Sequence, residues 1–217
     1  MDKGSVKLPE HEKAYRDLRD MILFGELKPG QAVTIQGLIG TLKVGMTPVR
    51  EAIRRLTSQG ALVFQGNRRV SVPEMTASQW DDIALVRLVV EPELARRSLE
   101  NIGVSQVNAL TQTDADLNAA IAAGDVRGYL ECNTRFHMDL YALAGSDVLL
   151  SVAQSLWLRG GPSLRVVLGR YGTANLPDKH AEALEAMTVG DADALANAIS
   201  GDIQQGIDQV RLSFAKA

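Results

Sequence analysis

One stretch near the N-terminus combines an amphipathic helix with two short strands, and few small folds contain that order of elements. Residues 47–60 (TPVREAIRRLTSQG) carry a strong helix start, with Thr47 as the predicted N-cap and Pro48 as the first helical residue. Two runs typical of strands follow at 61–64 (ALVF) and 68–72 (RRVSV), separated by the turn sequence QGN. The apolar residues of the helix recur at intervals of three and four, on one face: Val49, Ala52, Ile53 and Leu56. We therefore expect a helix that packs by one face and leads into a hairpin.

Two more helices are predicted before this stretch. Residues 10–24 place Tyr15, Leu18 and Ile22 on one stripe, and a short helix is expected over 35–42. Three helices and a hairpin, with a tight turn between the second and third helices, describe a winged helix-turn-helix. We place this domain at residues 1–74 and a second domain at residues 77–217.

Basic side chains gather in the first domain. Residues 1–74 carry 12 Lys and Arg against 8 Asp and Glu, whereas residues 75–217 carry 11 against 18. On the third helix Arg50 and Arg54 lie opposite the apolar face, where a helix entering the major groove of DNA needs positive charge. The candidate DNA contacts from this pattern are Lys43, Arg50, Arg54, Arg68 and Arg69. The alternative is an ordinary solvated helix with surface arginines.

The chain after residue 77 is predicted to be entirely helical. Its apparent breaks divide it into about six helices, and they fall at 101–105, 122–125, 144–147, 169–178 and 189–191. No apolar run is long enough to span a membrane, the N-terminus lacks the apolar segment of a signal peptide, and a single Cys132 excludes an intramolecular disulfide. We expect a mainly α, cytoplasmic protein whose acidic helical domain serves as a sensor and dimerisation unit.

Several segments resemble one family of regulators. Residues 22–30 (ILFGELKPG) and 42–62 (LKVGMTPVREAIRRLTSQGAL) resemble the DNA-binding domain of GntR-family bacterial transcription regulators. The second domain is similar to the FadR-type effector domain called FCD, in its shorter VanR-like variety. This similarity rests on RLVVEPELA (87–95), FHMDLYALAGS (136–146), KHAEAL (179–184) and VGDADALANAI (189–199).

The resemblance implies a homodimer on a palindromic operator in double-stranded DNA. It also implies that Arg50 contacts DNA and that Thr47 lies near the phosphates. The family usually has Ser-Arg before Thr-Pro, whereas this chain has Gly45 and Met46. One usual DNA-contacting arginine is therefore missing, and the operator sequence cannot be inferred from relatives.

The same resemblance implies a metal site. Many members hold a divalent cation with an Asp and a His at i,i+4 and with two later His, and the metal receives the carboxylate of a small organic acid. The matching positions here are Asn133, His137, His180 and Asp202, so the carboxylate has moved from the first position to the fourth. We expect Zn²⁺, Ni²⁺ or Mn²⁺, since the loss of an imidazole weakens Zn²⁺ and Ni²⁺ binding and an oxygen-richer set tolerates Mn²⁺ or Mg²⁺. The alternative is a metal-free polar pocket that binds the effector directly.

A carboxylate effector also calls for a cation. Arg87 and Arg159 are the candidates, and Arg165 is a weaker one; the alternative for Arg87 is a surface pair with Glu91. We expect a ligand-responsive, DNA-binding transcription regulator that acts as a repressor and is not an enzyme, because no H-E-x-x-H motif or nucleophile elbow occurs. The alternatives are a metal-dependent enzyme with an accessory N-terminal module and an effector-independent DNA-binding protein.

Overall fold

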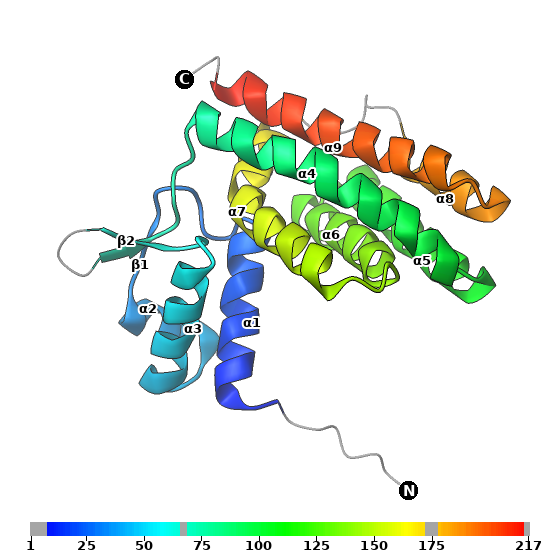
Figure 1. The fold of residues 1–217 in the computed structure, drawn as a ribbon. Helices are drawn as coiled ribbons and strands as arrows, with labels where there is room; N and C mark the ends of the chain where they lie inside the picture. The colour runs from blue at the N-terminus through cyan, green and yellow to red at the C-terminus, as the bar shows by residue number, and fades with distance from the viewer. Residues whose placement is uncertain (1–7, 66–68, 172–177, 215–217) are drawn as a thin grey trace, which may run out of the picture.

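The computed structural model describes residues 8–65, 69–171 and 178–214, with only the backbone described for residues 164–171. The N-terminal part, here called the head, contains three helices and a small antiparallel sheet (Figure 1). The helices are α1 (Glu10–Leu23), α2 (Ile35–Leu42) and α3 (Met46–Ser58). The strands are β1 (Ala32–Val33), β2 (Val63–Gln65) and β3 (Arg69–Ser71), and their order in the sheet is β1-β3-β2. The predicted winged helix-turn-helix is confirmed.

The predicted start of α3 is wrong by two residues. The helix begins at Met46, and Gly45 is its N-cap, without a hydrogen bond from any side chain. Thr47 is therefore already helical and exposed. Pro48 fits inside the first turn because the first N–H groups of a helix have no partner within the helix. The predicted end is right, since Gly60 follows α3 with a φ of 74°.

Strand β1 was not predicted, and it completes the sheet. It consists of two residues, and its buried Val33 pairs with Val70 of β3. A strand this short cannot show the alternation of apolar and polar residues that identifies strands in a sequence. The sheet therefore ties the loop between α1 and α2 to the hairpin.

The rest of the described chain, here called the body, is helical, and its helices end at all five predicted breaks. The helices are α4 (Ala77–Ser98), α5 (Val104–Ala123), α6 (Val126–Ala142), α7 (Asp147–Tyr171), α8 (Lys179–Val189) and α9 (Ala192–Phe214), with a 3-10 turn at Leu99–Asn101. Left-handed glycines follow α5 and α8, at Gly124 and Gly190. In the part of the chain that is described, no helix has the length and apolarity to cross a membrane.

Helix α7 belongs to the body but also packs against the head. Its Trp157 and Leu158 join the buried apolar cluster of the head, which includes Leu18, Ile22 and Leu56. A Cβ atom at Gly161 would overlap the backbone of Leu23, so the glycine lets α1 and α7 approach closely. Figure 1 shows the upper end of α1 meeting α7. The head is therefore seated on the body through α7.

Candidate functional site

Three of the four predicted ligand positions meet inside the body. The Nε2 atoms of His137 on α6 and His180 on α8 are 3.3 Å apart. A carboxylate oxygen of Asp202, on α9, is 3.0 Å from His137 Nε2, and its other oxygen is 3.9 Å from His180 Nε2. Both histidines are buried. One potential ligand atom from each of the three side chains lies within 4.8 Å of the other two.

The fourth predicted position, Asn133, is buried on α6 one turn before His137. Positions i and i+4 lie on the same helix face, so the amide is on the side of α6 that carries His137. The amide oxygen of a residue at this position is a further potential ligand for a hard cation.

Each histidine is also held through its other ring nitrogen. His137 Nδ1 is 2.9 Å from the Tyr141 hydroxyl, and His180 Nδ1 is 3.1 Å from a carboxylate oxygen of Asp114. The amide of Asn118 donates a hydrogen bond to the second Asp114 oxygen at 3.1 Å. Metal-ligating histidines almost always have such a partner on the far nitrogen, which fixes the tautomer and the ring orientation.

The local environment shifts the pKa values of the three side chains in different directions. Burial lowers the pKa of His137. Burial would also lower the pKa of His180, but the hydrogen bond with Asp114 and the negative charge of Asp202 raise it overall. Burial would raise the pKa of Asp202, whereas the hydrogen bond from His137 and nearby positive charge lower it overall. The cluster therefore keeps an ionised carboxylate beside a neutral His137.

These residues fit a divalent cation. Imidazole nitrogens bound to one metal at about 2.1 Å are roughly 3.0 to 3.4 Å apart, and the Nε2 atoms of His137 and His180 are 3.3 Å apart. Two imidazoles and one carboxylate are ligands for first-row transition metals, and an amide oxygen is an acceptable further ligand for the harder ones. The donor atoms of His137, His180 and Asp202, their spacing and the partners on the far ring nitrogens are thus those that a divalent cation requires.

Arg87 forms a buried ion pair rather than a surface pair. Its Nε donates to Glu91 at 2.6 Å, and the Glu91 side chain is fully buried. The hydroxyl of Tyr141 and the indole N–H of Trp157 donate to the same carboxylate at 2.8 and 2.9 Å. Because the Tyr141 hydroxyl also contacts His137, the ion pair directly adjoins the histidine cluster.

Arg159 does not join this cluster. Its side chain is exposed and lies beside Gly60, at the end of α3. It is therefore part of the contact between body and head. Arg165 lies in the segment whose side chains are not described.

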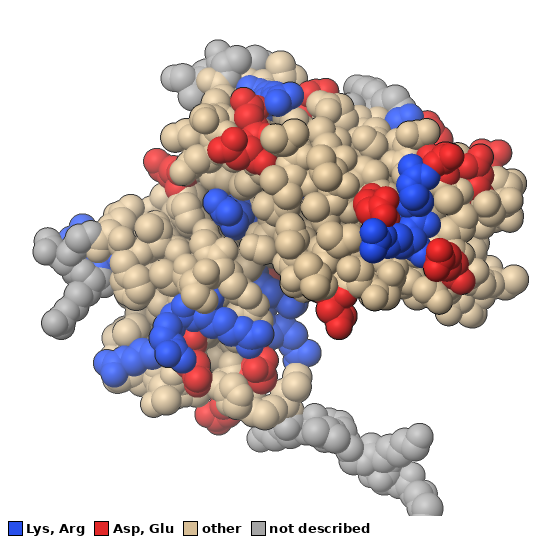
Figure 2. All heavy atoms as spheres, in the orientation of Figure 1, with Lys and Arg blue, Asp and Glu red and all other residues tan. Residues whose placement is uncertain are grey.

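The candidate DNA contacts lie on the outer surface of the head. All the described ones are exposed, namely Lys43, Thr47, Arg50, Arg54 and Arg69, and Arg68 lies outside the described residues. Figure 2 shows Lys and Arg side chains gathered across the head, at the lower left of the molecule. The surface therefore offers the positive charge that phosphate contacts need.

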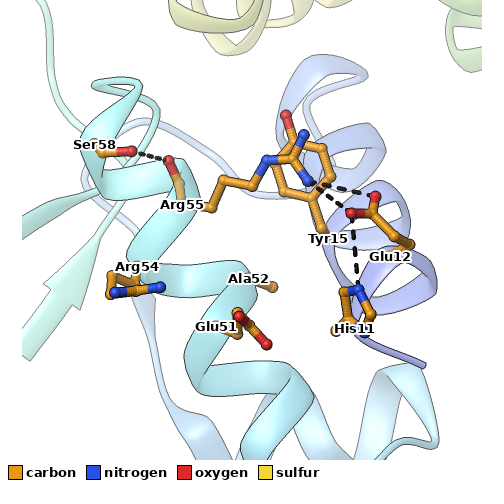
Figure 3. Close-up of a pocket in the computed structure, with 8 residues that line it drawn as sticks. All are labelled: His11, Glu12, Tyr15, Glu51, Ala52, Arg54, Arg55 and Ser58. Atoms are coloured by element: carbon orange, nitrogen blue, oxygen red, sulfur yellow. Dashed lines mark hydrogen bonds and ion pairs between the residues drawn. The ribbon is translucent and has the colours of Figure 1, made fainter. Parts of the chain in front are cut away.

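Arg55 has a different role from its neighbour Arg54. Its guanidinium lies 3.6 Å from the centre of the Tyr15 ring and donates to Glu12 at 3.2 Å. Figure 3 shows Arg55 reaching from α3 to these α1 side chains, beside a cavity of about 330 Å³ that Arg54 also lines without contacting Tyr15 or Glu12. Arg55 thus fastens α3 to α1, and Arg54 remains available to a partner.

Sequence reasoning missed three side chains of the buried network, Asp114, Tyr141 and Trp157, and it also missed the full burial of Glu91. Tyr141 follows His137 by four residues, and this spacing was a usable signal. Asp114 and Trp157 come from distant helices, and no local pattern places them near the histidines.

Comparison with known proteins identifies both halves. Residues 10–72 match the family described as bacterial regulatory proteins, gntR family, and residues 82–205 match the FCD domain. The HTH-type transcriptional regulator McbR of Escherichia coli K12 is 28% identical over 195 residues, which cover 88% of each chain. The HTH-type transcriptional repressor RspR of the same organism is 24% identical and covers 94% of this chain and 90% of its own.

Solved structures agree with the fold. The structure of E. coli McbR/YncC matches with a TM-score of 0.89 at 25% identity, covering 96% of this chain and all of that one. A transcriptional regulator from Rhodococcus sp. RHA1 matches with a TM-score of 0.74 at 22% identity, covering 92% and 96%. The seating of head on body is thus part of an architecture shared with McbR.

Proposed function

This chain belongs to the gntR family of bacterial regulatory proteins and carries an FCD domain, and we propose that it represses its target genes until a small organic acid binds beside His137. The relatives are transcription regulators, so the chain is a regulator and not an enzyme. The name of RspR as a repressor supports the direction of the response.

A divalent metal ion is proposed as the resident cofactor of the FCD domain. His137, His180 and Asp202 would hold it, and Asn133 would complete the set through its amide oxygen. The observation that carries this proposal is the oxygen partner on the far nitrogen of each histidine, Tyr141 on one and Asp114 on the other. When bound, the metal supplies a buried positive charge that can receive the carboxylate of the effector.

Arg87 is given an indirect part in effector binding. Its guanidinium neutralises Glu91, which would otherwise be an unpaired buried carboxylate close to the site. An effector carboxylate can then approach without repulsion from Glu91. Arg159 lies on the surface beside Gly60, so we propose that it contributes to the contact between head and body rather than to effector binding.

The proposed regulator acts as a homodimer. Helix α4 exposes three apolar side chains on one face, with Leu85 and Val89 65% exposed and Val86 38% exposed. Exposed apolar groups one helical turn apart suit a self-complementary contact, in which the two copies of α4 lie against each other. Such a dimer presents two heads to the two halves of a palindromic operator.

One experiment, the selection of DNA duplexes from a random pool followed by addition of metal and small acids, tests both DNA binding and the response to an effector. Duplexes that the protein selects from a random pool should share an inverted repeat, and Zn²⁺ with small mono- and dicarboxylates should weaken the protein's affinity for them. The same acid should raise the melting temperature of the metal-loaded protein, since a ligand stabilises the state that it binds. Failure to select any duplex would reject DNA recognition. An unchanged affinity and melting temperature with every acid would favour an effector-independent DNA-binding protein.

A further inference from the structure

A line of buried hydrogen bonds leads from the histidine cluster to helix α7. His137 Nδ1 contacts the Tyr141 hydroxyl at 2.9 Å, and that hydroxyl donates to a carboxylate oxygen of Glu91 at 2.8 Å. The same Glu91 oxygen accepts the indole N–H of Trp157 at 2.9 Å. All four side chains are buried. Water does not compete for these buried hydrogen bonds, so a change in the hydrogen bonding of His137 can affect the position of Trp157.

Trp157 is where this line meets the head. On one side its ring lies 5.0 Å from the ring of His137, measured between centres. On the other side it belongs to the apolar cluster of the head and, with Leu23 and Phe24, lines a cavity of about 380 Å³ between head and body. The cavity gives the indole room to shift, which a fully packed core would deny.

A second residue of α7, Gly161, contacts the backbone of α1 directly. Gly161, one helical turn further along α7, meets the backbone of Leu23 so closely that any Cβ atom there would overlap it. The position of α7 at residues 157–161 is therefore also the position of the C-terminal end of α1. A small displacement of Trp157 would be passed to the head rather than absorbed by side chains between them.

The Tyr141 hydroxyl has one proton for two neighbours. When His137 carries its proton on Nε2 and donates it to Asp202, Nδ1 is an acceptor and competes with Glu91 for the Tyr141 proton. When Nε2 is occupied by a ligand, His137 carries its proton on Nδ1 and donates it to Tyr141. The Tyr141 proton is then committed to Glu91. Occupation of the cluster therefore decides how firmly Glu91 is held.

We propose that Trp157 is the positioning residue through which occupation of the His137 cluster reaches the DNA-binding head. This inference rests on the proposed function, because it requires that the cluster binds a metal. Occupation of His137 Nε2 orders Tyr141 and Glu91, Glu91 fixes the Trp157 indole, and the indole anchors the end of α1. The head of the occupied protein is held more firmly on the body than that of the empty protein.

The experiment compares amide hydrogen exchange in α1 with and without Zn²⁺, in the full-length protein. Zn²⁺ should slow exchange over Met21–Leu23 about fivefold in the wild type, the factor expected from one buried hydrogen bond of ordinary strength. Trp157→Phe keeps an aromatic ring but removes the N–H that Glu91 accepts, so the slowing should disappear. Trp80→Phe is the matched control, because the indole of Trp80 donates to Ile207 inside the body and not to Glu91.

Elemental analysis of each variant separates the two levels of the proposal. Stoichiometric zinc in all variants, with slowing lost only in Trp157→Phe, supports the inference. Stoichiometric zinc with equal slowing in Trp157→Phe overturns it and leaves the metal proposal standing. A wild-type protein that binds no zinc overturns both.

A second variant covers the case in which Trp157→Phe does not fold. Tyr141→Phe keeps the ring but removes the hydroxyl proton, and it should abolish the slowing while zinc remains bound. Persistent slowing in Tyr141→Phe would overturn the relay from His137 to Glu91.

Discussion

His137 and His180 face each other through their Nε2 atoms at 3.3 Å, while their Nδ1 atoms are held by Tyr141 and Asp114. Two imidazoles in this orientation direct a lone pair of each ring toward a common point whenever both Nδ1 atoms carry the proton. Asp202 adds a carboxylate at the same place. The helices α6, α8 and α9 thus bring together three potential ligands that lie far apart in the sequence.

The double substitution His137→Ala with His180→Ala should abolish metal binding. It removes both imidazoles and leaves only the oxygen donors of Asp202 and Asn133. Elemental analysis after incubation with Zn²⁺, Ni²⁺ or Mn²⁺ and desalting measures the outcome. His11→Ala is the matched control, since the third histidine of the chain is exposed on α1. Equal metal content in the double variant and in the control would contradict the assignment.

Asn133→Asp should strengthen metal binding by about tenfold, because affinity for a hard cation rises with the number of charged oxygen ligands. Without metal, the new carboxylate would be buried one helical turn from His137 and should lower the melting temperature. The rise in melting temperature on adding Mn²⁺ should therefore be larger than in the wild type. A variant that responds to Mn²⁺ no more than the wild type would favour a metal-free polar pocket.

Metal affinity should fall as the pH is lowered, and Asp114→Asn should move that fall to lower pH. The pKa of His180 is raised, so His180 holds its proton, which the metal must displace, up to a higher pH than an ordinary histidine does. The hydrogen bond that His180 Nδ1 donates to the Asp114 carboxylate is one cause of the raised pKa, and replacing the carboxylate lowers the pKa of His180 again. Titration of Zn²⁺ affinity against pH tests this.

The affinity of Asp114→Asn at neutral pH should also fall, by roughly 10- to 100-fold, because the orienting partner of His180 is weakened. Asp139→Asn is the control, since Asp139 lies on the exposed side of α6. A pH profile of Asp114→Asn that coincides with those of the wild type and the control would show that Asp114 does not influence the site.

Arg50→Ala should weaken DNA binding by roughly 1–3 kcal/mol if Arg50 reads a base, or lower the salt dependence by about one phosphate contact if it binds the backbone. Fluorescence anisotropy with a selected duplex at several salt concentrations distinguishes the two. Arg97→Ala removes the same charge from the body, outside the head, and should leave binding unchanged. Equal affinity of the two variants would reject the role of α3.

Leu85→Glu combined with Val89→Glu should convert the dimer to a monomer, since four like charges would meet across the two copies of α4. Light scattering during size-exclusion chromatography measures the mass. Val104→Glu is the control, because Val104 is 79% exposed on α5 and outside the proposed contact. A dimer that survives the double substitution must use another surface.

The sequence predicted the fold well wherever local chemistry determines it. Glycine and aspartate mark the ends of the body helices, and the breaks that they predict match the structure. The two errors in the head have local causes. Strand β1 is too short to produce a pattern, and the side chain of Thr47 was assigned a capping role although the helix begins one residue before it.

The candidate site was predicted only through resemblance to a family. His137 and His180 are 43 residues apart, and no periodicity joins α6 to α8. The pairing of Arg87 with Glu91 was visible as a spacing of four, but its burial was not, because burial depends on α6 and α7 packing over α4. Local patterns find the members of a helix face, whereas the tertiary arrangement decides which faces meet.

Because α7 contributes apolar side chains to the core of the head, a fragment that contains the head alone is not expected to be stable. Trp157 and Leu158 fill the base of the head's own cluster, so a fragment that ends after β3 would leave that base open to water. The DNA-binding part is therefore not a self-contained module. In the full-length protein, the head should unfold at the same temperature as the body. A chimaera that joins this head to the body of another regulator should fold only if it also includes α7.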